Sequence, residues 1–338
     1  MKQKVLIFFT ISLLVLIFQN SCNFKNEDYK LAHDTTFHAE TRAWSQKIYE
    51  EPDNDEFYAE RALSFINNDK NYKLAVKDLE KAIKLNPDKN SYYIKLADAY
   101  FGNNQTYKAR DMYLKAVSRN ADAETYFKTG SFFFLVRKYN EAKIYLNEAL
   151  KKDESYPKAY FFLAQSFKET GDTANAIMYY KRAVQTDAGD YNAYLQLGII
   201  FTIKSDPEAL KYLDAAINTN NGIDESWYSR GFYYQKKGDF EKALADYQQT
   251  ITINPYHSNA YYNAGYIYFE LKKWDIAIRH FDLSSRTNDD FEKPVYMLGL
   301  SYEAKNDFEK ARIYYQKCLQ LNPNYNLAKT AIQRLNNQ

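Results

Sequence analysis

Two cysteines and four histidines are the side chains of this 338-residue chain best suited to nucleophilic catalysis or metal binding. Either chemistry needs several such groups held close together. Only His33 and His38 are near each other in sequence, and no cysteine accompanies that pair. The motifs GxxxxGK[ST], HExxH and GxSxG are all missing. We therefore expect no enzymatic activity, no metal and no cofactor.

Cys22 follows an apolar run of 14 residues, VLIFFTISLLVLIF, which itself follows the basic start MKQK. A membrane-spanning helix needs about 20 residues, so this pattern predicts a signal peptide over residues 1–21. The end of the run, QNSC, resembles the lipobox of bacterial lipoproteins, in which the cysteine is acylated and becomes the first residue. Ser21 fits that motif, whereas Gln19 departs from its usual Leu. The resemblance implies lipid attachment at Cys22; the alternative is an ordinary cleaved signal with an incidental cysteine.

Residues 22–37 are polar and aperiodic, which predicts a flexible tether after the lipidated cysteine. Within it, Lys25, Glu27 and Asp28 resemble the lysine-plus-acidic tag that sends some Gram-negative lipoproteins to the cell surface. A solvated linker would explain them equally well. The expected location is the bacterial cell envelope, with the chain anchored by lipid and facing the periplasm or the surface.

The rest of the chain is built on a repeat. An alanine recurs at 75, 109, 142, 176, 209, 243, 277 and 311, with intervals of 33 or 34 residues. A small residue, Gly or Ala, lies 11 to 13 residues before each alanine, and an aromatic residue usually lies four residues before that. These spacings define one face on each of two successive helices, here called helix A and helix B. Gly (10) and Pro (7) are scarce, which also favours an all-helical chain.

This pattern resembles the tetratricopeptide repeat, TPR. The resemblance implies an all-α, right-handed TPR superhelix, or α-solenoid. It would contain an N-terminal helix or half repeat at 38–53, about eight repeats over 54–323 and a C-terminal capping helix at 324–338. Repeat positions are counted from the small residue of helix A, position 8, and from the alanine of helix B, position 20. Cys318 then falls at position 27, where other repeats carry Ala, and is expected to be a small buried residue.

TPR proteins commonly bind ligands on a concave wall formed by their A helices, through positions that include 5, 9 and 12. Carried onto this sequence, those positions predict an aromatic ligand groove made of Phe127, Phe134, Phe161, Tyr228, Phe232, Tyr262, Tyr266, Phe269 and Tyr296. Such rings suit extended peptides, loops or sugars. Rings at these positions also pack against neighbouring helices, so both roles stay open.

The resulting hypothesis is a non-enzymatic scaffold, anchored by lipid, that binds partner proteins or peptides in this groove. The alternatives are a glycan- or small-ligand-binding surface lipoprotein and a regulator of an envelope hydrolase. The charges, 45 Lys and Arg against 43 Asp and Glu, do not favour nucleic acid as a partner. The carboxylate clamp of chaperone-binding TPRs is incomplete, because Tyr228 and Phe232 stand where it needs Lys and Asn. The oligomeric state stays open.

Overall fold

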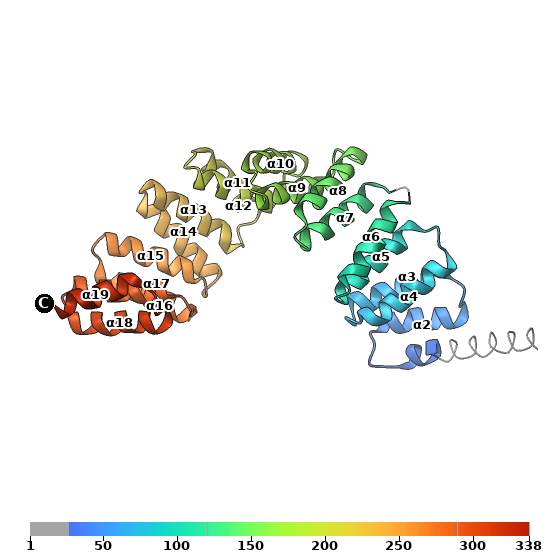
Figure 1. The fold of residues 1–338 in the computed structure, drawn as a ribbon, viewed down its shortest axis with the longest axis horizontal. Coiled ribbons are helices and arrows are strands. Elements are labelled where there is room, and N and C mark those ends of the chain that lie inside the picture. The colour runs from blue at the N-terminus through green and yellow to red at the C-terminus, as the bar shows by residue number, and fades with distance from the viewer. Residues whose placement is uncertain (1–26, 120, 289, 338) are drawn as a thin grey trace, which may run out of the picture. The chain divides into compact units, whose positions relative to one another are not determined.

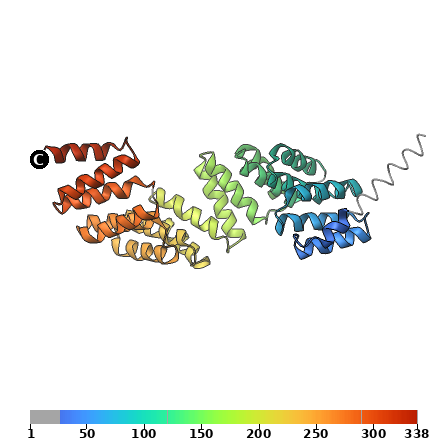
Figure 2. The same ribbon diagram turned by 90° about the horizontal axis from the view of Figure 1, so that it is seen from below.

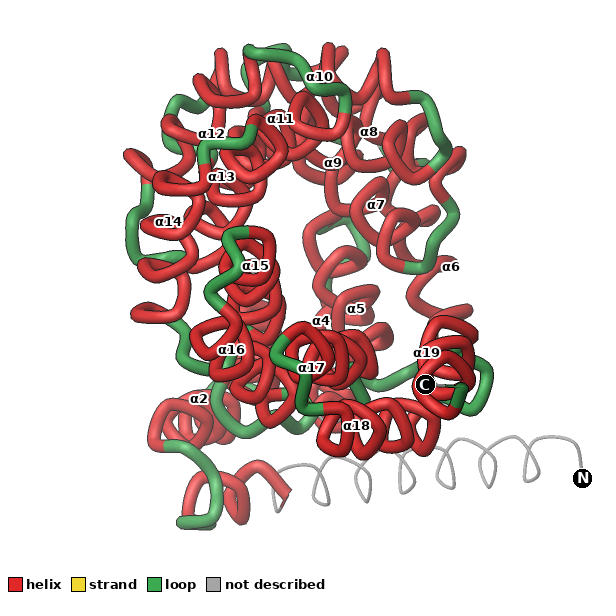
Figure 3. Tube along the Cα trace, turned by 90° about the vertical axis from the view of Figure 1, so that its left-hand side faces the viewer, coloured by secondary structure: helices red, strands yellow, loops and turns green. Residues whose placement is uncertain are grey.

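A computed structural model describes residues 27–119, 121–288 and 290–337. Within these ranges the regular structure is entirely helical, and the helices alternate with short loops (Figures 1 and 3). Cys22 and the signal peptide expected over 1–21 lie outside the described residues. Among the residues described, no helix combines the length and the apolar character that a membrane crossing requires. The expectation of an all-α TPR solenoid is confirmed.

The chain divides into two compact units, residues 1–176 and 177–338. In the first unit, each helix packs on the next along the chain (Figure 1). Its helices are α2 (Ala39–Glu50), α3 (Asp55–Asn67), α4 (Tyr72–Leu85), α5 (Asn90–Gly102), α6 (Thr106–Val117), α7 (Ala123–Leu135), α8 (Tyr139–Lys152) and α9 (Pro157–Glu169). The boundary between the units falls within α10 (Thr173–Thr186).

The second unit repeats the same arrangement, and Figure 2 shows its consecutive helices lying side by side. Its helices are α11 (Tyr191–Ile203), α12 (Glu208–Thr219), α13 (Asp224–Lys237), α14 (Phe240–Ile253), α15 (Ser258–Glu270), α16 (Trp274–Thr287), α17 (Glu292–Ala304), α18 (Phe308–Leu321) and α19 (Asn326–Asn336). Odd numbers from α3 to α17 are A helices and even numbers from α4 to α18 are B helices.

Close contact between the A and B helices of a repeat depends on the small residue at position 8. At Gly299 an added Cβ would lie 2.5 Å from the ring of Tyr315, which is fully buried. Ala97 holds the same position opposite Tyr113, and both side chains are buried. The repeated glycine, which alone would cost a helix about 1 kcal/mol relative to Ala, therefore has a packing reason.

The turn between helix A and helix B has one residue in the left-handed conformation in every repeat. Only Gly171 and Gly238 are glycines, with φ of 81° and 78°. The other six carry side chains and have φ between 53° and 63°: Lys70, Asn104, Arg137, Ser205, Lys272 and Asn306. The identical backbone conformation shows that each hairpin is closed in the same way, whichever residue is present.

Near the amino terminus the structure differs from the expected flexible tether over 22–37. Residues 27–33 are helical, and Asp28 is buried in an ion pair with Arg61. The backbone N–H of His38 then donates to Asp69, 2.8 Å away, and Phe37 packs edge-on against Phe65. Sequence reasoning took these polar residues for solvated ones because their partners lie more than 30 residues away. Helix α2 lies within the expected half repeat, and α19 within the expected capping segment.

Candidate functional site

An apolar pocket lies between two neighbouring A helices of the second unit, α11 and α13. It has a volume of about 190 Å³ and is lined by Ile199, Thr202, Ile203, Glu225, Tyr228, Ser229 and Phe232. Two of its walls are exposed apolar side chains, Ile203 at 68% and Phe232 at 38%. These two side chains and the half-buried Ile199 form a small apolar cluster beside the pocket, a feature that binding surfaces share.

The pocket belongs to a longer row of apolar residues at position 9 of the A helices. We call Ile199, Phe232, Tyr266 and Leu300 the position-9 row; they come from α11, α13, α15 and α17. Each of these A helices contacts the next. Tyr266 is 38% exposed, and burial together with the neighbouring Glu270 raises its pKa. Phe232 and Tyr266 are the exposed members of the row, whereas Ile199 and Leu300 are half-buried and Leu300 also packs against the core.

Polar groups fix the borders of the pocket. The Lys236 ammonium donates to the carbonyl oxygen of Thr202, 3.1 Å away, and so links α13 to α11. The half-exposed Glu225 carboxylate lies 3.9 Å from the Nε2 atom of His257. Tyr228 accepts a hydrogen bond from the Asn263 amide, 3.2 Å away, and burial raises the pKa of this tyrosine. The pocket thus has an apolar interior and one carboxylate at its border.

Position 5, which was expected to line the groove, performs another task. In four repeats its aromatic ring lies against the ring of the residue that precedes α9, α15, α17 or α19, the helix that begins the next repeat or caps the last one. The centroid distances are 5.0 Å for Phe127–Tyr156, 4.6 Å for Tyr228–His257, 5.3 Å for Tyr262–Phe291 and 5.2 Å for Tyr296–Tyr325. Four of the predicted groove residues therefore connect one repeat to the next, since a residue at position 5 faces the junction.

The other residues predicted to line the groove differ in how far their side chains are exposed. Phe134 and Phe161 are half-buried and both pack against Phe162, as does Phe127. Phe269 lies edge-on to Trp274, 4.9 Å between centroids, at the margin of the core around Phe281. Phe127 is only 8% exposed and is a core residue, so its assignment to an open groove was wrong. Of the nine residues, Phe232 and Tyr266 are exposed, and Tyr228 and Phe232 lie together in the pocket between α11 and α13.

Sequence reasoning missed the two isoleucines of the pocket. Ile199 holds position 9, the same as Phe232, and Ile203 lies one turn further along α11. A prediction that rests on aromatic rings does not include aliphatic residues at the same positions. It also missed a buried arginine, Arg61, which holds position 7 where several repeats have Leu.

The described residues offer no grouping of three or more His, Cys, Asp and Glu side chains that could hold a metal ion. Cys318 is fully buried, as expected, and burial raises the pKa of its thiol to about 11. The thiolate is the reactive form, so this cysteine is a packing residue. His280 is stacked on Tyr268, and burial lowers its pKa, which keeps the ring neutral.

Family models described as tetratricopeptide repeat match residues 59–124, 136–193, 225–257 and 294–325, together more than half of the chain. The chain belongs to the tetratricopeptide repeat proteins.

A TPR repeat-containing protein of Methanocaldococcus jannaschii is 26% identical over 204 residues, 57% of this chain and 36% of that protein. The anaphase-promoting complex subunit 3 of Schizosaccharomyces pombe is 25% identical over 122 residues, 36% of this chain and 18% of that protein. The chain thus spans roughly a third or less of these relatives.

Among solved structures, the C-terminal part of a TPR repeat-containing protein from Cytophaga hutchinsonii superposes with a TM-score of 0.59. It is 18% identical, and the match covers 71% of this chain and 99% of that one. At this identity the similarity establishes the fold alone.

Proposed function

We propose that this protein is a non-enzymatic scaffold that binds extended segments of partner proteins along the position-9 row. The observation that carries the proposal is the pocket between α11 and α13, where Ile203 and Phe232 are exposed. The S. pombe relative is named as a subunit of a multiprotein complex, which agrees with an assembly role.

The size of the pocket favours a peptide over a free small molecule. Small-molecule sites usually have about 300–1,000 Å³, whereas this pocket has about 190 Å³. A space of this size suits one bulky apolar side chain, and the rest of an extended segment would then continue along the row towards Tyr266. Glu225 at the border favours a basic residue beside that anchor.

Peptide display on the purified chain tests this function. Enriched sequences should share a bulky aliphatic or aromatic residue, and Phe232→Ala should weaken their binding about tenfold or more, because a central apolar anchor contributes roughly 2 kcal/mol. Ile313→Ala is the matched control: this residue is 45% exposed on a B helix and should leave binding unchanged. Equal binding by wild type and Phe232→Ala would contradict the proposal, and retention of polysaccharide lost on Phe232→Ala would favour the glycan-binding alternative.

We further propose that lipid on Cys22 anchors the scaffold in the bacterial cell envelope. The support is the apolar run before Ser21 and Cys22 in the sequence. Metabolic labelling with a fatty-acid analogue should mark the wild type, and Cys22→Ala should lose both the label and the membrane fraction. Label that persists in the variant would exclude this anchor.

A further inference from the structure

Two repeats carry an arginine at position 7, and the same two carry an aspartate at position 23. The pairs are Arg61 with Asp78 and Arg230 with Asp246; the other repeats have neither residue at these positions. Both arginines bind their aspartate through two hydrogen bonds, 2.7 and 2.8 Å long. The chain therefore contains the same ion pair twice, fully buried in the first unit and partly buried in the second.

The two arginines differ in where their second carboxylate comes from. Arg230 receives it from Asp214 on the preceding B helix, at 2.7 Å. Arg61 receives it from Asp28, also at 2.7 Å, and Asp28 lies outside the repeats. The residue of α2 equivalent to Asp214 is Ser45, whose hydroxyl oxygen accepts a hydrogen bond from the Arg61 guanidinium at 3.2 Å. The first repeat thus has an arginine whose second carboxylate is not supplied by the helices around it.

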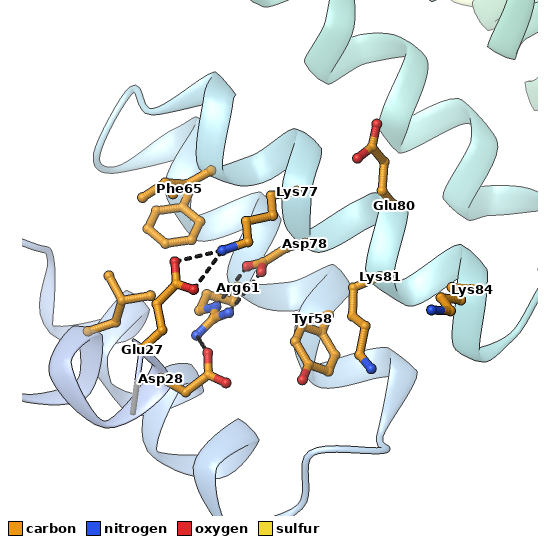
Figure 4. A pocket seen from close by; sticks show the side chains of 12 residues that line it. Glu27, Asp28, Tyr58, Arg61, Phe65, Lys77, Asp78, Glu80, Lys81 and Lys84 are labelled. Carbon is orange, nitrogen blue, oxygen red and sulfur yellow. Dashed lines mark hydrogen bonds and ion pairs between the residues drawn. The ribbon is translucent and has the colours of Figure 1, made fainter. Parts of the chain in front are cut away.

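The surface around Arg61 is suited to an acidic, amphipathic segment. A pocket of about 250 Å³ lies here, lined on its apolar side by Leu31, Phe65 and Leu74. Helix α4 contributes three lysines to the lining: Lys77, Lys81 and Lys84 (Figure 4). Lys77 binds the Glu27 carboxylate at 2.6 and 2.7 Å.

Residues 27–33 border this surface through three side chains, and Tyr29 lies beside Tyr49 near the end of α2, with 5.6 Å between the ring centroids. Glu27, Asp28 and Leu31 line the pocket, so two acids followed by a leucine form the contacting pattern. The residues that follow are attached separately, since the His38 N–H bonds to Asp69 and Phe37 packs on Phe65. Residues 27–33 could therefore move off without disturbing the start of α2.

We infer that the surface formed by α3 and α4 around Arg61 is a second binding site, which takes an acidic helical segment of a partner protein. Residues 27–33 occupy one side of this site in the free chain, where Asp28 pairs with Arg61 and Glu27 with Lys77, and they imitate the partner segment. Exchange of one acidic segment for another keeps Arg61 paired throughout, so the cost of leaving a buried charge without its partner does not arise. The internal segment lowers the apparent affinity for the partner until it is displaced.

A labelled peptide with the sequence of residues 27–37, EDYKLAHDTTF, serves as the probe for the full-length chain. Asp28→Lys should release the internal segment and increase peptide affinity about tenfold over wild type, because the site is then free in a larger fraction of molecules. In that background, Arg61→Leu with Asp78→Tyr should abolish binding. In the last repeat, positions 7 and 23 hold Leu298 and Tyr314, so this pair of residues is compatible with the fold of a repeat.

Asp214→Lys in the second unit is the matched control, and it should not alter peptide binding. Hydrogen exchange supplies an independent readout: Asp28→Lys should accelerate exchange in residues 27–33 while α3 and α4 keep their protection. Equal peptide affinity of wild type and Asp28→Lys would overturn the inference. Loss of protection throughout α3 and α4 would also overturn it, since residues 27–33 would then be a fixed part of the first repeat.

Discussion

The A helices of the two units differ at the position that faces outward. At position 9, the repeats of α5, α7 and α9 carry Asp98, Ser131 and Gln165 and that of α3 carries Leu63, whereas those of α11, α13, α15 and α17 carry the position-9 row. Asp98 is engaged within its unit, by the Tyr113 hydroxyl and the Lys128 ammonium. Identical hairpins thus present a polar surface in much of the first unit and an apolar one in the second. The fold sets where a side chain points, and the residue type decides whether that position can bind a partner.

A second difference lies at position 8. All four repeats that begin in the second unit have glycine there, whereas three of the four in the first unit have alanine: Ala62, Ala97 and Ala164. The A and B helices of the second unit therefore approach each other more closely at this position than those of the first unit do where alanine is present. Together the two positions show that the second unit combines tight internal contacts with an open apolar face.

The largest effect is expected from removing the buried arginine of the first unit. Arg61→Leu should lower the free energy of unfolding by about 4 kcal/mol, because it leaves Asp28 and Asp78 buried without a cation. Arg230→Leu should cost less, since the Asp214 side chain is 43% exposed and can be solvated. Urea unfolding followed by circular dichroism measures both. An equal loss would mean that the two ion pairs are energetically alike.

A smaller loss of stability is expected when the aromatic residues of the predicted groove are replaced, and its size should differ between buried and exposed rings. Phe127→Ala should cost about 3 kcal/mol, because the ring is buried and connects two repeats. Phe232→Ala should change stability by only about 0.5 kcal/mol, since its ring is partly exposed. Thermal unfolding of both variants distinguishes them. If Phe232→Ala proved as costly as Phe127→Ala, the position-9 row would be a packing feature.

The glycines of the second unit provide the next comparison. Gly299→Ala should destabilise by about 1–3 kcal/mol, because the new methyl group would lie 2.5 Å from the Tyr315 ring. The reverse change in the first unit, Ala97→Gly, should cost about 1 kcal/mol through helix propensity alone. Denaturant midpoints of the two variants measure this. A stabilising Gly299→Ala would show that the helices separate easily.

The smallest effects concern two helix caps that respond to pH in opposite ways. The backbone N–H of Thr125 donates to Asp122 and lowers the pKa of that carboxyl, whereas burial raises the pKa of Asp190. The stabilisation from Asp122 is present above its unfolded pKa, about 3.9, and is lost as pH falls through the lower folded value. Asp190 contributes in the opposite sense: its effect is most favourable below the unfolded pKa and is lost as pH rises through the raised value.

Asp122→Ala should accordingly cost about 1 kcal/mol near pH 7, and the difference from wild type should shrink in acid. For Asp190→Ala the wild type should gain relative to the variant as the pH is lowered. Unfolding midpoints over a pH series check both signs. A parallel pH dependence of the two variants would contradict the assignment.

Much of the fold could be predicted because it depends on local spacing. The recurring alanine, the small residue before it and the aromatic residue at position 4 fix the face of each helix, and neighbouring hairpins must bury those faces. The candidate site was harder to predict. Position 5 and position 9 both fall on helix A, and only the placement of the next repeat shows that Tyr262 meets Phe291 while Tyr266 stays exposed.

Residues 27–33 could not be assigned for a different reason. The stretch has too few apolar residues to signal burial, and its contacts depend on Arg61 and Lys77, 33 and 50 residues further along. A long-range ion pair leaves no periodic mark in the sequence. Arg61 itself indicates a buried ion pair, because a charged residue at a position where several repeats have leucine needs a partner of opposite charge.

The left-handed turn residues have a practical consequence for engineering. Six of the eight turns hold a residue with a side chain in a conformation that costs most amino acids roughly 1–2 kcal/mol. Glycine would relieve that strain at a partly offsetting cost in the entropy of the unfolded chain. At turns that share no contact, such changes should add independently. Each hairpin thus provides a separate site for adjusting thermal stability, away from the surface that meets a partner.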